Sequence, residues 1–411
     1  MKLSEELSWR GFVNQTTFAD ISELDERELT FYFGVDPSAP SMQIGNLAAA
    51  MMVRHFIEHG HKAVLLVGGA TGLIGDPDGK KQERELKTQE EIERNKRAIV
   101  RQYEQVFAGQ DFTLVDNYDW FKDIDYLGFL RDVGKHVPMR QMLARDFVQS
   151  RLSEGGAGIS YAEFSYALIQ GYDFLHLFRE HGVNLQICGA DQWGNSIAGV
   201  DLIRRVTGEE AHVWSSPLVI NQATGKKFGK SEDGAIWLDA NSTSPFAFYQ
   251  FWLNVDDEGV EQYLKYYTLL DQQQLADVMD QFRERPAERH AQRTLAFEVT
   301  RIVHGQETAQ AVRNVTSALY GSEAVATELS ADERELLKQE LPVFHAATHE
   351  PLELLVHSGV AQSKRQAREF VASGAIRLNG QQIQSLDELT FDAGLTIVRR
   401  GKNTVVLVEG N

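Results

Sequence analysis

The chain contains very little cysteine and proline and no long apolar run. Cys188 is the only cysteine among 411 residues, so neither an intrachain disulfide nor a zinc site built from several cysteines is possible. No segment approaches the roughly eighteen consecutive apolar residues of a membrane span, and the first residues lack the apolar stretch of a secretory signal. These absences predict a protein of a reducing compartment, and we expect it in the cytoplasm with no membrane partner.

Positive charge is also scarce. The chain has 41 Lys and Arg residues against 59 Asp and Glu residues, a formal net charge of −18 at pH 7. The distribution is uneven, because residues 351–411 hold seven basic and six acidic side chains, net +1, which leaves −19 for residues 1–350. An evenly acidic surface would repel nucleic acid. The C-terminal part is therefore the better candidate for contacts with phosphates.

The first half of the chain alternates short apolar runs with helical patterns. Buried strands are predicted at 29–35, 63–67, 112–115 and 185–188, and a helix with one broad apolar side at 45–60. Strands that alternate with helices predict right-handed crossovers and a Rossmann-like parallel sheet, an α/β fold. In such sheets ligands bind beyond the carboxyl ends of the strands.

Changes in pattern divide the chain further. Residues 244–321 have helical periodicity, and the tail has the short elements of a small α+β domain. The predicted parts are a Rossmann-like catalytic domain over 1–220, a lysine-containing loop and linker over 221–243, an α-helical domain over 244–321, a connection over 322–348 and a C-terminal domain over 349–411.

The segment ATGKKFGKSEDG is the strongest local signal. Lys227 and Lys230 could neutralise a polyphosphate, Ser231 adds a hydroxyl, and the glycines allow the loop to move. A P-loop is excluded, because Gly225 and Gly229 are separated by three residues instead of four. Spacing alone leaves a lysine-rich surface turn open as the alternative.

A second segment runs from a strand through a polar turn into a helix. Gly34, at the end of the strand, allows a ligand to approach the backbone. Gly45 opens the helix, whose N-terminal dipole favours phosphate. Taken alone, the segment could equally be an ordinary turn between a strand and a helix.

Together the two segments resemble the class I aminoacyl-tRNA synthetases. Gln43-Ile44-Gly45-Asn46 stands where that class has His-Ile-Gly-His, and Lys227-Phe228-Gly229-Lys230-Ser231 stands where it has Lys-Met-Ser-Lys-Ser. Over nearly the whole chain the resemblance narrows to the bacterial-type tyrosyl-tRNA synthetase family. The further matching segments are VGGATGLIGDPDGKK, NYDW, FLRDVGKH, EFSYALIQGYDF, DQWGN and SPFAFYQFW.

The resemblance implies a tyrosine–tRNA ligase. Such an enzyme activates L-tyrosine with ATP, releases pyrophosphate and transfers tyrosine to the 3′-terminal adenosine of tRNA(Tyr). The resemblance further implies ATP with Mg²⁺ as co-substrate, no permanently bound cofactor or dedicated metal site, and a homodimer formed through an insertion in the catalytic domain. Two alternatives stay open, namely a tryptophan-specific relative and a catalytically degenerate RNA-binding protein.

The resemblance also implies a site for tyrosine. Tyr32 and Asp173 match the pair that holds the phenolic hydroxyl, Tyr32 donating and Asp173 accepting; phenylalanine would leave both buried groups unpaired, which is costly. Tyr166, Gln170 and Asp173 have the spacing of one helix face. The alternative is that they form a row of exposed polar side chains on the helix surface. The tyrosine positions carried over from the family are Tyr32, Asp76, Asn117, Tyr166, Gln170, Asp173 and Gln192.

The nucleotide and the reacting phosphates have their own family positions. Those around ATP and the adenylate are Gly34, Asp36, Gly45, Gly189, Asp191 and Lys230. Those predicted to be catalytic are Gln43, Asn46, Lys80, Arg84, Lys227, Lys230 and Ser231. Gln43 departs from the family histidine; it keeps an N–H donor but cannot carry charge.

The tail resembles the S4-like RNA-binding module over 351–382. Lys364, Arg365 and Arg368 are predicted on one helix, where they would contact tRNA phosphates. A solvated basic helix is the alternative. Because the rest of the chain is acidic, a few basic points should hold the tRNA, and its affinity should be modest and salt-sensitive.

Overall fold

The computed structural model describes residues 1–77, 86–153, 155–222, 224–225, 228–231, 234–320, 329–391, 393–401 and 404–410. The chain divides into two compact units. One comprises Met1–Ser244 and Phe251–Val303, and the other comprises Pro245–Gln250 and His304–Asn411. No helix among the described residues is both long enough and apolar enough to cross a membrane.

The first unit is built on a six-stranded sheet. Its strands are β1 (Gln15–Thr16), β2 (Thr30–Val35), β3 (Lys62–Val67), β4 (Phe112–Asp116), β5 (Leu185–Gly189) and β6 (His212–Ser216). They lie in the order β1-β6-β5-β2-β3-β4, and all neighbours are parallel except β1 on β6. The predicted Rossmann-like parallel sheet is confirmed. The strand order reverses between β2 and β5, and such a switch point opens a crevice at the carboxyl ends of the strands.

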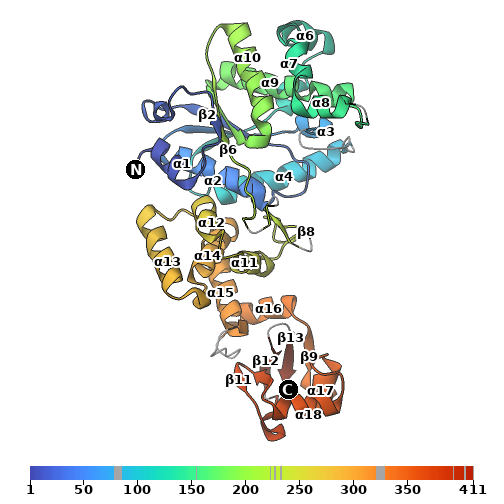
Figure 1. The fold of residues 1–411 in the computed structure, drawn as a ribbon. Coiled ribbons are helices and arrows are strands. Elements are labelled where there is room, and N and C mark those ends of the chain that lie inside the picture. Colours follow the sequence, from blue (N-terminus) through green and yellow to red (C-terminus); the bar gives the residue numbers. More distant parts are fainter. Residues whose placement is uncertain are drawn as a thin grey trace. The chain divides into compact units, whose positions relative to one another are not determined.

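Helices cover both faces of this sheet. Figure 1 shows α2 (Ile44–Glu58) and α4 (Gln89–Val106) on one side and α9 (Tyr161–His181) and α10 (Trp193–Thr207) on the other. Between the strands and α9 and α10 lies a buried core that includes Val64, Leu66 and Phe174. The predicted helix at 45–60 is α2, whose apolar side is buried.

Further helices and a small hairpin complete the unit. The helices are α1 (Leu3–Arg10), α3 (Thr71–Ile74), α5 (Tyr118–Phe121), α6 (Tyr126–Asp132), α7 (Met139–Leu143), α8 (Asp146–Leu152), α12 (Val260–Tyr267), α13 (Gln272–Glu284) and α14 (His290–His304). The hairpin pairs β7 (Lys230–Ser231) with β8 (Gly234–Ala235). The division between the units falls inside α11 (Pro245–Leu253) and at the end of α14.

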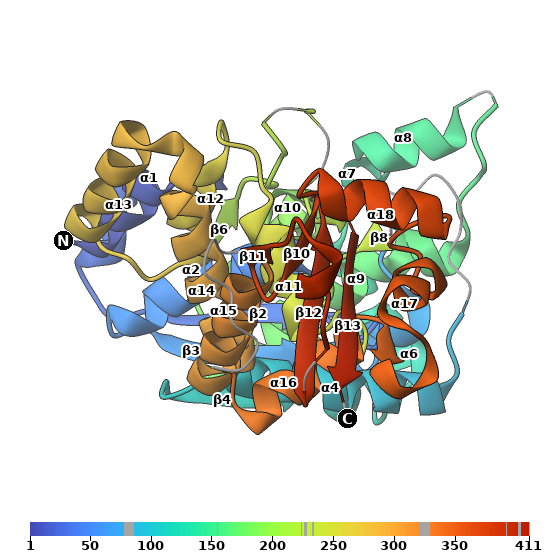
Figure 2. The same ribbon diagram turned by 90° about the horizontal axis from the view of Figure 1, so that it is seen from below.

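The second unit carries a five-stranded sheet. Its elements are α15 (Gln306–Tyr320), α16 (Ala331–Glu340), β9 (Val343–His345), α17 (Pro351–His357), α18 (Lys364–Ala372), β10 (Ile376–Leu378), β11 (Gln381–Gln382), β12 (Gly394–Arg400) and β13 (Thr404–Gly410). The strand order is β11-β10-β12-β13-β9. Figure 2 shows α17 and α18 beside β12 and β13, and apolar side chains of both helices share one core with the strands. The predicted α+β tail is present.

The elements near the division differ from the predicted boundaries. Residues 322–348 were predicted to be a connection, but their described part contains α16 and β9, and β9 pairs in parallel with β13. The tail sheet therefore begins before residue 349. The strand VFH is too short to be recognised from sequence, because it forms through a partner more than 60 residues away. The predicted helical domain over 244–321 is likewise divided, since α15 belongs to the second unit.

Candidate active site

A cavity of about 460 Å³ lies at the carboxyl ends of β2 and β5, the predicted place for a ligand. It is lined by residues from both halves of the sheet. The predicted site residues among them are Tyr32, Gly34, Asp36, Gln43, Gly45, Asn46, Asp76, Tyr166, Gln170, Asp173, Gly189, Asp191 and Gln192. Asn117, which follows β4, is fully buried behind the lining. Segments far apart in the sequence are therefore brought together in one cavity.

The apolar end of the cavity contains two buried polar groups. The hydroxyl of Tyr32 is buried and has no hydrogen-bond partner in the part of the chain that the structure describes. The carboxylate of Asp173 accepts from Trp120 Nε1 at 2.9 Å and from Asn117 Nδ2 at 3.1 Å. Burial raises the pKa of Asp173 well above its ordinary value, although these two hydrogen bonds oppose the shift. Burial also raises the pKa of Tyr32, so its hydroxyl stays a donor.

A hydrogen-bonded network continues from Asp173 to Asp36. Asn117 Nδ2 also donates to Thr71 Oγ1 at 2.9 Å, and Thr71 donates to Asp36 Oδ1 at 2.6 Å. The other oxygen of Asp36 accepts from the hydroxyl of Tyr166 at 2.6 Å. Burial, followed by the negative charge of Asp36, raises the pKa of Tyr166 well above its ordinary value. The carboxylate of Asp36 is thus held in one orientation beside the crevice at the carboxyl ends of β2 and β5.

Further amide and carboxylate groups line the cavity. Gln192 Nε2 donates to Asp76 Oδ2 at 2.5 Å, and Asn195 Nδ2 donates to Gln192 Oε1 at 3.1 Å. Among the described residues, the side-chain oxygen of Gln170 is buried without a hydrogen-bond partner. The cavity therefore offers several acceptors, which suit a positively charged group.

The two signature segments meet at the N-terminus of α2. Gln43 forms an isolated antiparallel bridge with Trp237, and the N–H of Ile44 donates to the carbonyl of Ile236 at 3.2 Å. Gly229 has a φ of 109°, and a Cβ there would lie 3.0 Å from Ile44 Cγ1. A glycine is therefore needed where the lysine loop approaches the helix. Asn46 Oδ1 accepts the N–H of Gln43 at 3.0 Å, which satisfies one free donor of the helix end.

An aromatic cluster anchors the same loop. Phe228 is buried and stacks on Tyr263, with ring centroids 4.2 Å apart. It also contacts Phe251, Trp252 and Tyr267. Aromatic packing of this kind stabilises by burial and by ring geometry. The loop is thus fixed on one side by its central phenylalanine.

Some predicted residues cannot be placed. Lys80, Arg84 and Lys227 lie outside the described residues. Lys230 and Ser231 are described by their backbone alone, as β7. Among the described residues, no group of three or more His, Cys, Asp or Glu side chains could hold a metal ion.

Cys188 lies at the end of β5, beside the cavity. It is buried, and burial raises the pKa of its thiol to about 12. A protonated buried thiol is a poor nucleophile, so Cys188 serves as a small structural residue near the end of the strand.

The three predicted tRNA contacts lie in the second unit, exposed on α18. Lys364 forms an ion pair with Glu353, and Arg365 forms one with Glu369 at 3.0 Å. Arg368 is exposed on the same helix. Exposed ion pairs of this kind contribute little stability, so these cations can exchange their partners for phosphates.

Comparison with known proteins identifies the family. The sequence profile of the class I tRNA synthetases (W and Y) matches residues 24–321, and that of the tyrosine–tRNA ligase SYY-like C-terminal domain matches residues 333–408. The tyrosine–tRNA ligases of Ligilactobacillus salivarius and Geobacillus stearothermophilus are 44% identical to this chain over 421 and 422 residues, with full coverage of both chains. The chain belongs to the tyrosine–tRNA ligase family.

A solved structure agrees with this assignment. A C-terminally truncated mitochondrial tyrosyl-tRNA synthetase of Aspergillus nidulans is 30% identical, with a TM-score of 0.70. The match covers 78% of this chain and 94% of that one. The class I α/β fold of the catalytic unit is therefore shared with the tyrosyl-tRNA synthetases.

The structure of this family member adds residues that the sequence did not single out. Thr71 and Trp120 hold Asp36 and Asp173, and Phe228 anchors the lysine loop. Thr71 and Trp120 lie within segments that carry the family resemblance, which was the only sequence signal for them. Their hydrogen bonds depend on the placement of α3 and α5, which follow the carboxyl ends of β3 and β4.

Proposed function

We propose that this chain is a tyrosine–tRNA ligase that forms tyrosyl-adenylate and pyrophosphate from L-tyrosine and ATP and then esterifies tRNA(Tyr). The observation that carries the proposal is the buried hydroxyl of Tyr32, which no described residue satisfies, in a cavity that also contains the Asp173 carboxylate. A phenol at this end of the cavity would accept from Tyr32 and donate to Asp173. Phenylalanine would leave both groups unpaired in a buried place.

The remaining polar groups suit the other parts of the adenylate. The acceptors of Asp76, Tyr166 and Gln170 would receive the substrate ammonium. Asp36, Gly34, Gly189 and Asp191 lie where β2 and β5 end, and would bind the nucleotide at the switch point. Gln192, which is hydrogen-bonded to Asp76, would face the substrate carboxylate.

The first step requires positioning and charge stabilisation. The tyrosine carboxylate attacks the α-phosphorus of ATP, an oxygen–phosphorus bond forms, and pyrophosphate leaves with the bonding electrons. The carboxylate is already ionised, so no general base is needed. ATP enters as its magnesium complex, with the ion held by the phosphates. Gln43, Asn46, Lys80, Arg84, Lys227, Lys230 and Ser231 are proposed to stabilise the phosphates as their charge shifts.

The second step brings in the tRNA. A hydroxyl of its terminal adenosine attacks the activated carbonyl of tyrosyl-adenylate, and AMP leaves. Lys364, Arg365 and Arg368 on α18 would contact tRNA phosphates away from the reacting end. The single buried cysteine and these substrates support a cytoplasmic location.

A homodimer is also proposed. Exposed apolar side chains gather on α6 to α9 of the first unit, where Tyr126, Leu127, Met139, Leu152 and Tyr161 are each more than half exposed. Figure 1 shows α6, α7 and α8 beside α9 on the outer side of the sheet. An apolar surface of this kind is typical of an interface between subunits.

Amino-acid-dependent ATP–pyrophosphate exchange tests the proposal, followed by aminoacylation of tRNA(Tyr). We expect exchange with tyrosine and very little with phenylalanine or tryptophan. Exchange with tryptophan alone would assign the chain to a tryptophan-specific relative. No exchange with any amino acid would indicate a degenerate RNA-binding protein.

A further inference from the structure

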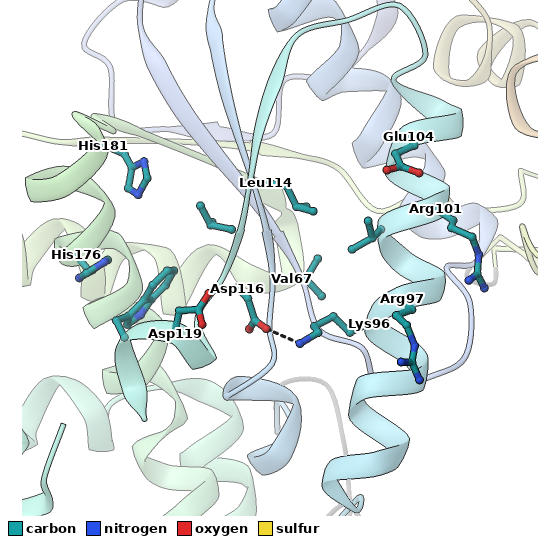
Figure 3. A pocket seen from close by; sticks show the side chains of 13 residues that line it. Val67, Lys96, Arg97, Arg101, Glu104, Leu114, Asp116, Asp119, His176 and His181 are labelled. Atoms are coloured by element: carbon teal, nitrogen blue, oxygen red, sulfur yellow. Dashed lines mark hydrogen bonds and ion pairs between the residues drawn. The ribbon is translucent and has the colours of Figure 1, made fainter. Parts of the chain in front are cut away.

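A second cavity, a groove of about 770 Å³, lies along the free edge of the first sheet. Figure 3 shows it between β4, α4 and the C-terminal part of α9. Its lining includes Lys96, Asp116, Trp120 and His176, none of which belongs to the predicted site. Trp120 stacks on His176 with ring centroids 4.4 Å apart and donates through its indole N–H to Asp173. The groove is therefore the outer side of the wall that holds the phenol-binding carboxylate.

Asp116 joins two turns of this wall. Its Oδ1 accepts the backbone N–H of Gly69 at 3.1 Å and that of Tyr118 at 2.9 Å. The first turn leads into α3, which begins with Thr71, and the second carries Asn117 and Trp120. A Cβ at Gly69 would lie 2.3 Å from Asp116 Oδ1, so the carboxylate fits only against a glycine. Asn117 Oδ1 accepts the backbone N–H of Ala70 at 2.7 Å, so Asp116 and Asn117 together set the spacing between the two turns.

Lys96 supplies the opposite charge. Its Nζ lies 2.7 Å from Asp116 Oδ2, the contact drawn as a dashed line in Figure 3. The two side chains are 21% and 18% exposed, so water screens the pair only in part. Burial disfavours the charged form of Lys96, but hydrogen bonds to Asp116 and Glu93 outweigh it and raise its pKa. Lys96 therefore stays charged and fixes the carboxylate of Asp116, whose other oxygen accepts from both turns.

We propose that Lys96 and Asp116 are a positioning pair for tyrosine recognition. The pair fixes the two turns, and the second turn holds the Asn117 and Trp120 donors against Asp173. Neither residue touches the substrate. Their effect should therefore fall on the binding of the phenol, whereas the phosphates contact other residues. This inference rests on the proposed function.

The test of this proposal compares the kinetics of full-length variants with single substitutions at the groove. Lys96→Met removes the charge and keeps most of the length, and Lys96→Arg restores the charge. Glu93→Gln and Arg97→Met are matched controls: Glu93 also pairs with Lys96 but contacts neither turn through any described hydrogen bond, and Arg97 is the neighbouring exposed cation of the groove. Tyrosine and ATP dependence are measured separately by pyrophosphate exchange, with phenylalanine as competing amino acid.

We expect Lys96→Met to raise the KM for tyrosine about tenfold and to reduce the preference for tyrosine over phenylalanine by a similar factor, with little change in the KM for ATP. Lys96→Arg should recover most of the loss, and both controls should behave as the unmodified enzyme. An unchanged tyrosine KM in Lys96→Met, or equal losses for tyrosine and ATP, would overturn the proposal.

Thermal unfolding accompanies each variant. If Lys96→Met does not fold, Asp116→Asn replaces it, because it keeps an oxygen acceptor for a backbone N–H and weakens the ion pair; the same selective loss of tyrosine recognition is expected, and its absence would overturn the proposal. The unmodified enzyme separates the two hypotheses. If the unmodified enzyme catalyses exchange and the variants have the same kinetics, the positioning pair alone is refuted. If the unmodified enzyme catalyses no exchange, the proposed function is refuted.

Discussion

Phe228 stacks on Tyr263 with their ring planes 22° apart, and this contact ties the lysine loop to α12. The phenylalanine sits between the two lysines proposed to act on pyrophosphate. Its ring is buried, so its position determines where the loop can lie. In the proposed function, this stacking would support catalysis through a side chain that does not itself react.

Phe228→Ala should lower the adenylation rate about tenfold with little change in the dissociation constant of tyrosine. The substitution removes the anchor of the loop and leaves the phenol end intact. Stopped-flow adenylation and equilibrium tyrosine binding measure the two quantities. Phe228→Met is the matched control, since a long apolar side chain can fill the same space; a loss as large as that of Phe228→Ala would contradict the anchoring role.

Gln43→Ala should slow adenylation about tenfold and leave tyrosine binding nearly unchanged. Gln43 precedes α2, and its side-chain amide can donate to a phosphate whose charge grows in the transition state. Single-turnover rates at saturating tyrosine and ATP give the effect. Equal losses in rate and in tyrosine affinity would exclude a role specific to the transition state. Gln43→His, which restores the family residue, is expected to retain activity.

As the pH falls, tyrosine binding should begin to weaken at a higher pH than it would if Asp173 were exposed. Burial raises the pKa of Asp173, so as the pH falls its carboxylate takes up a proton at a higher pH than usual and can no longer accept from the phenol. The KM for tyrosine should therefore rise toward acid pH. The KM for phenylalanine, which makes no such hydrogen bond, should change much less, and parallel changes would argue against Asp173 as the acceptor.

The same shift affects the stability of the unliganded protein. The folded state holds the Asp173 proton more tightly than the unfolded chain does. Its contribution to stability is thus present at low pH and is lost as the pH rises through the raised pKa. The charge of Asp173 thus opposes folding, and in the proposed function the same charge serves to recognise the phenol.

Substitutions on α18 should separate the two reaction steps. Lys364→Ala and Arg368→Ala are expected to lower the kcat/KM for tRNA several-fold and to leave tyrosine-dependent pyrophosphate exchange unchanged. Each lost phosphate contact should reduce the slope of log affinity against log salt by about one. A tRNA dissociation constant that stays constant as salt is raised would contradict the predicted phosphate contacts.

Leu127→Glu should weaken self-association at least about tenfold, because it would place a charge in an apolar interface. Leu127 is 74% exposed on α6, so the substitution should leave the fold of the unit unchanged. Sedimentation at several concentrations measures the dimer. Leu86→Glu, at an equally exposed leucine outside α6 to α9, is the control and should have no effect.

The sequence predicted the parts of the fold that follow from local pattern. Strands β2, β3, β4 and β5 are short apolar runs, and α2 has one apolar side, so their positions could be read directly. β6 has the sequence HVWSS and is buried by its neighbours, not by its own apolar character. β9 forms only through its pairing with β13. Neither β6 nor β9 therefore has a local sequence pattern that predicts a strand.

The site shows the same division. The helix spacing of Tyr166, Gln170 and Asp173 predicted a shared face, and all three line the cavity. The hydrogen bonds of Thr71 and Trp120 could not be predicted, because they join segments that are far apart in the sequence. The raised pKa of Asp173 likewise comes from burial, which no local sequence feature reveals.

The network from Asp36 through Thr71 and Asn117 to Asp173 has a thermodynamic consequence. It connects Asp36 with Asp173 through hydrogen bonds of 2.6, 2.9 and 3.1 Å. In the proposed function, Asp36 lies near the nucleotide and Asp173 near the phenol. A ligand that orders one end would then also order the other, so the second ligand would lose less conformational entropy on binding. Any such cooperativity must be reciprocal. Tyrosine and ATP would bind to one connected receptor, and the order in which they arrive would not alter the free energy they share.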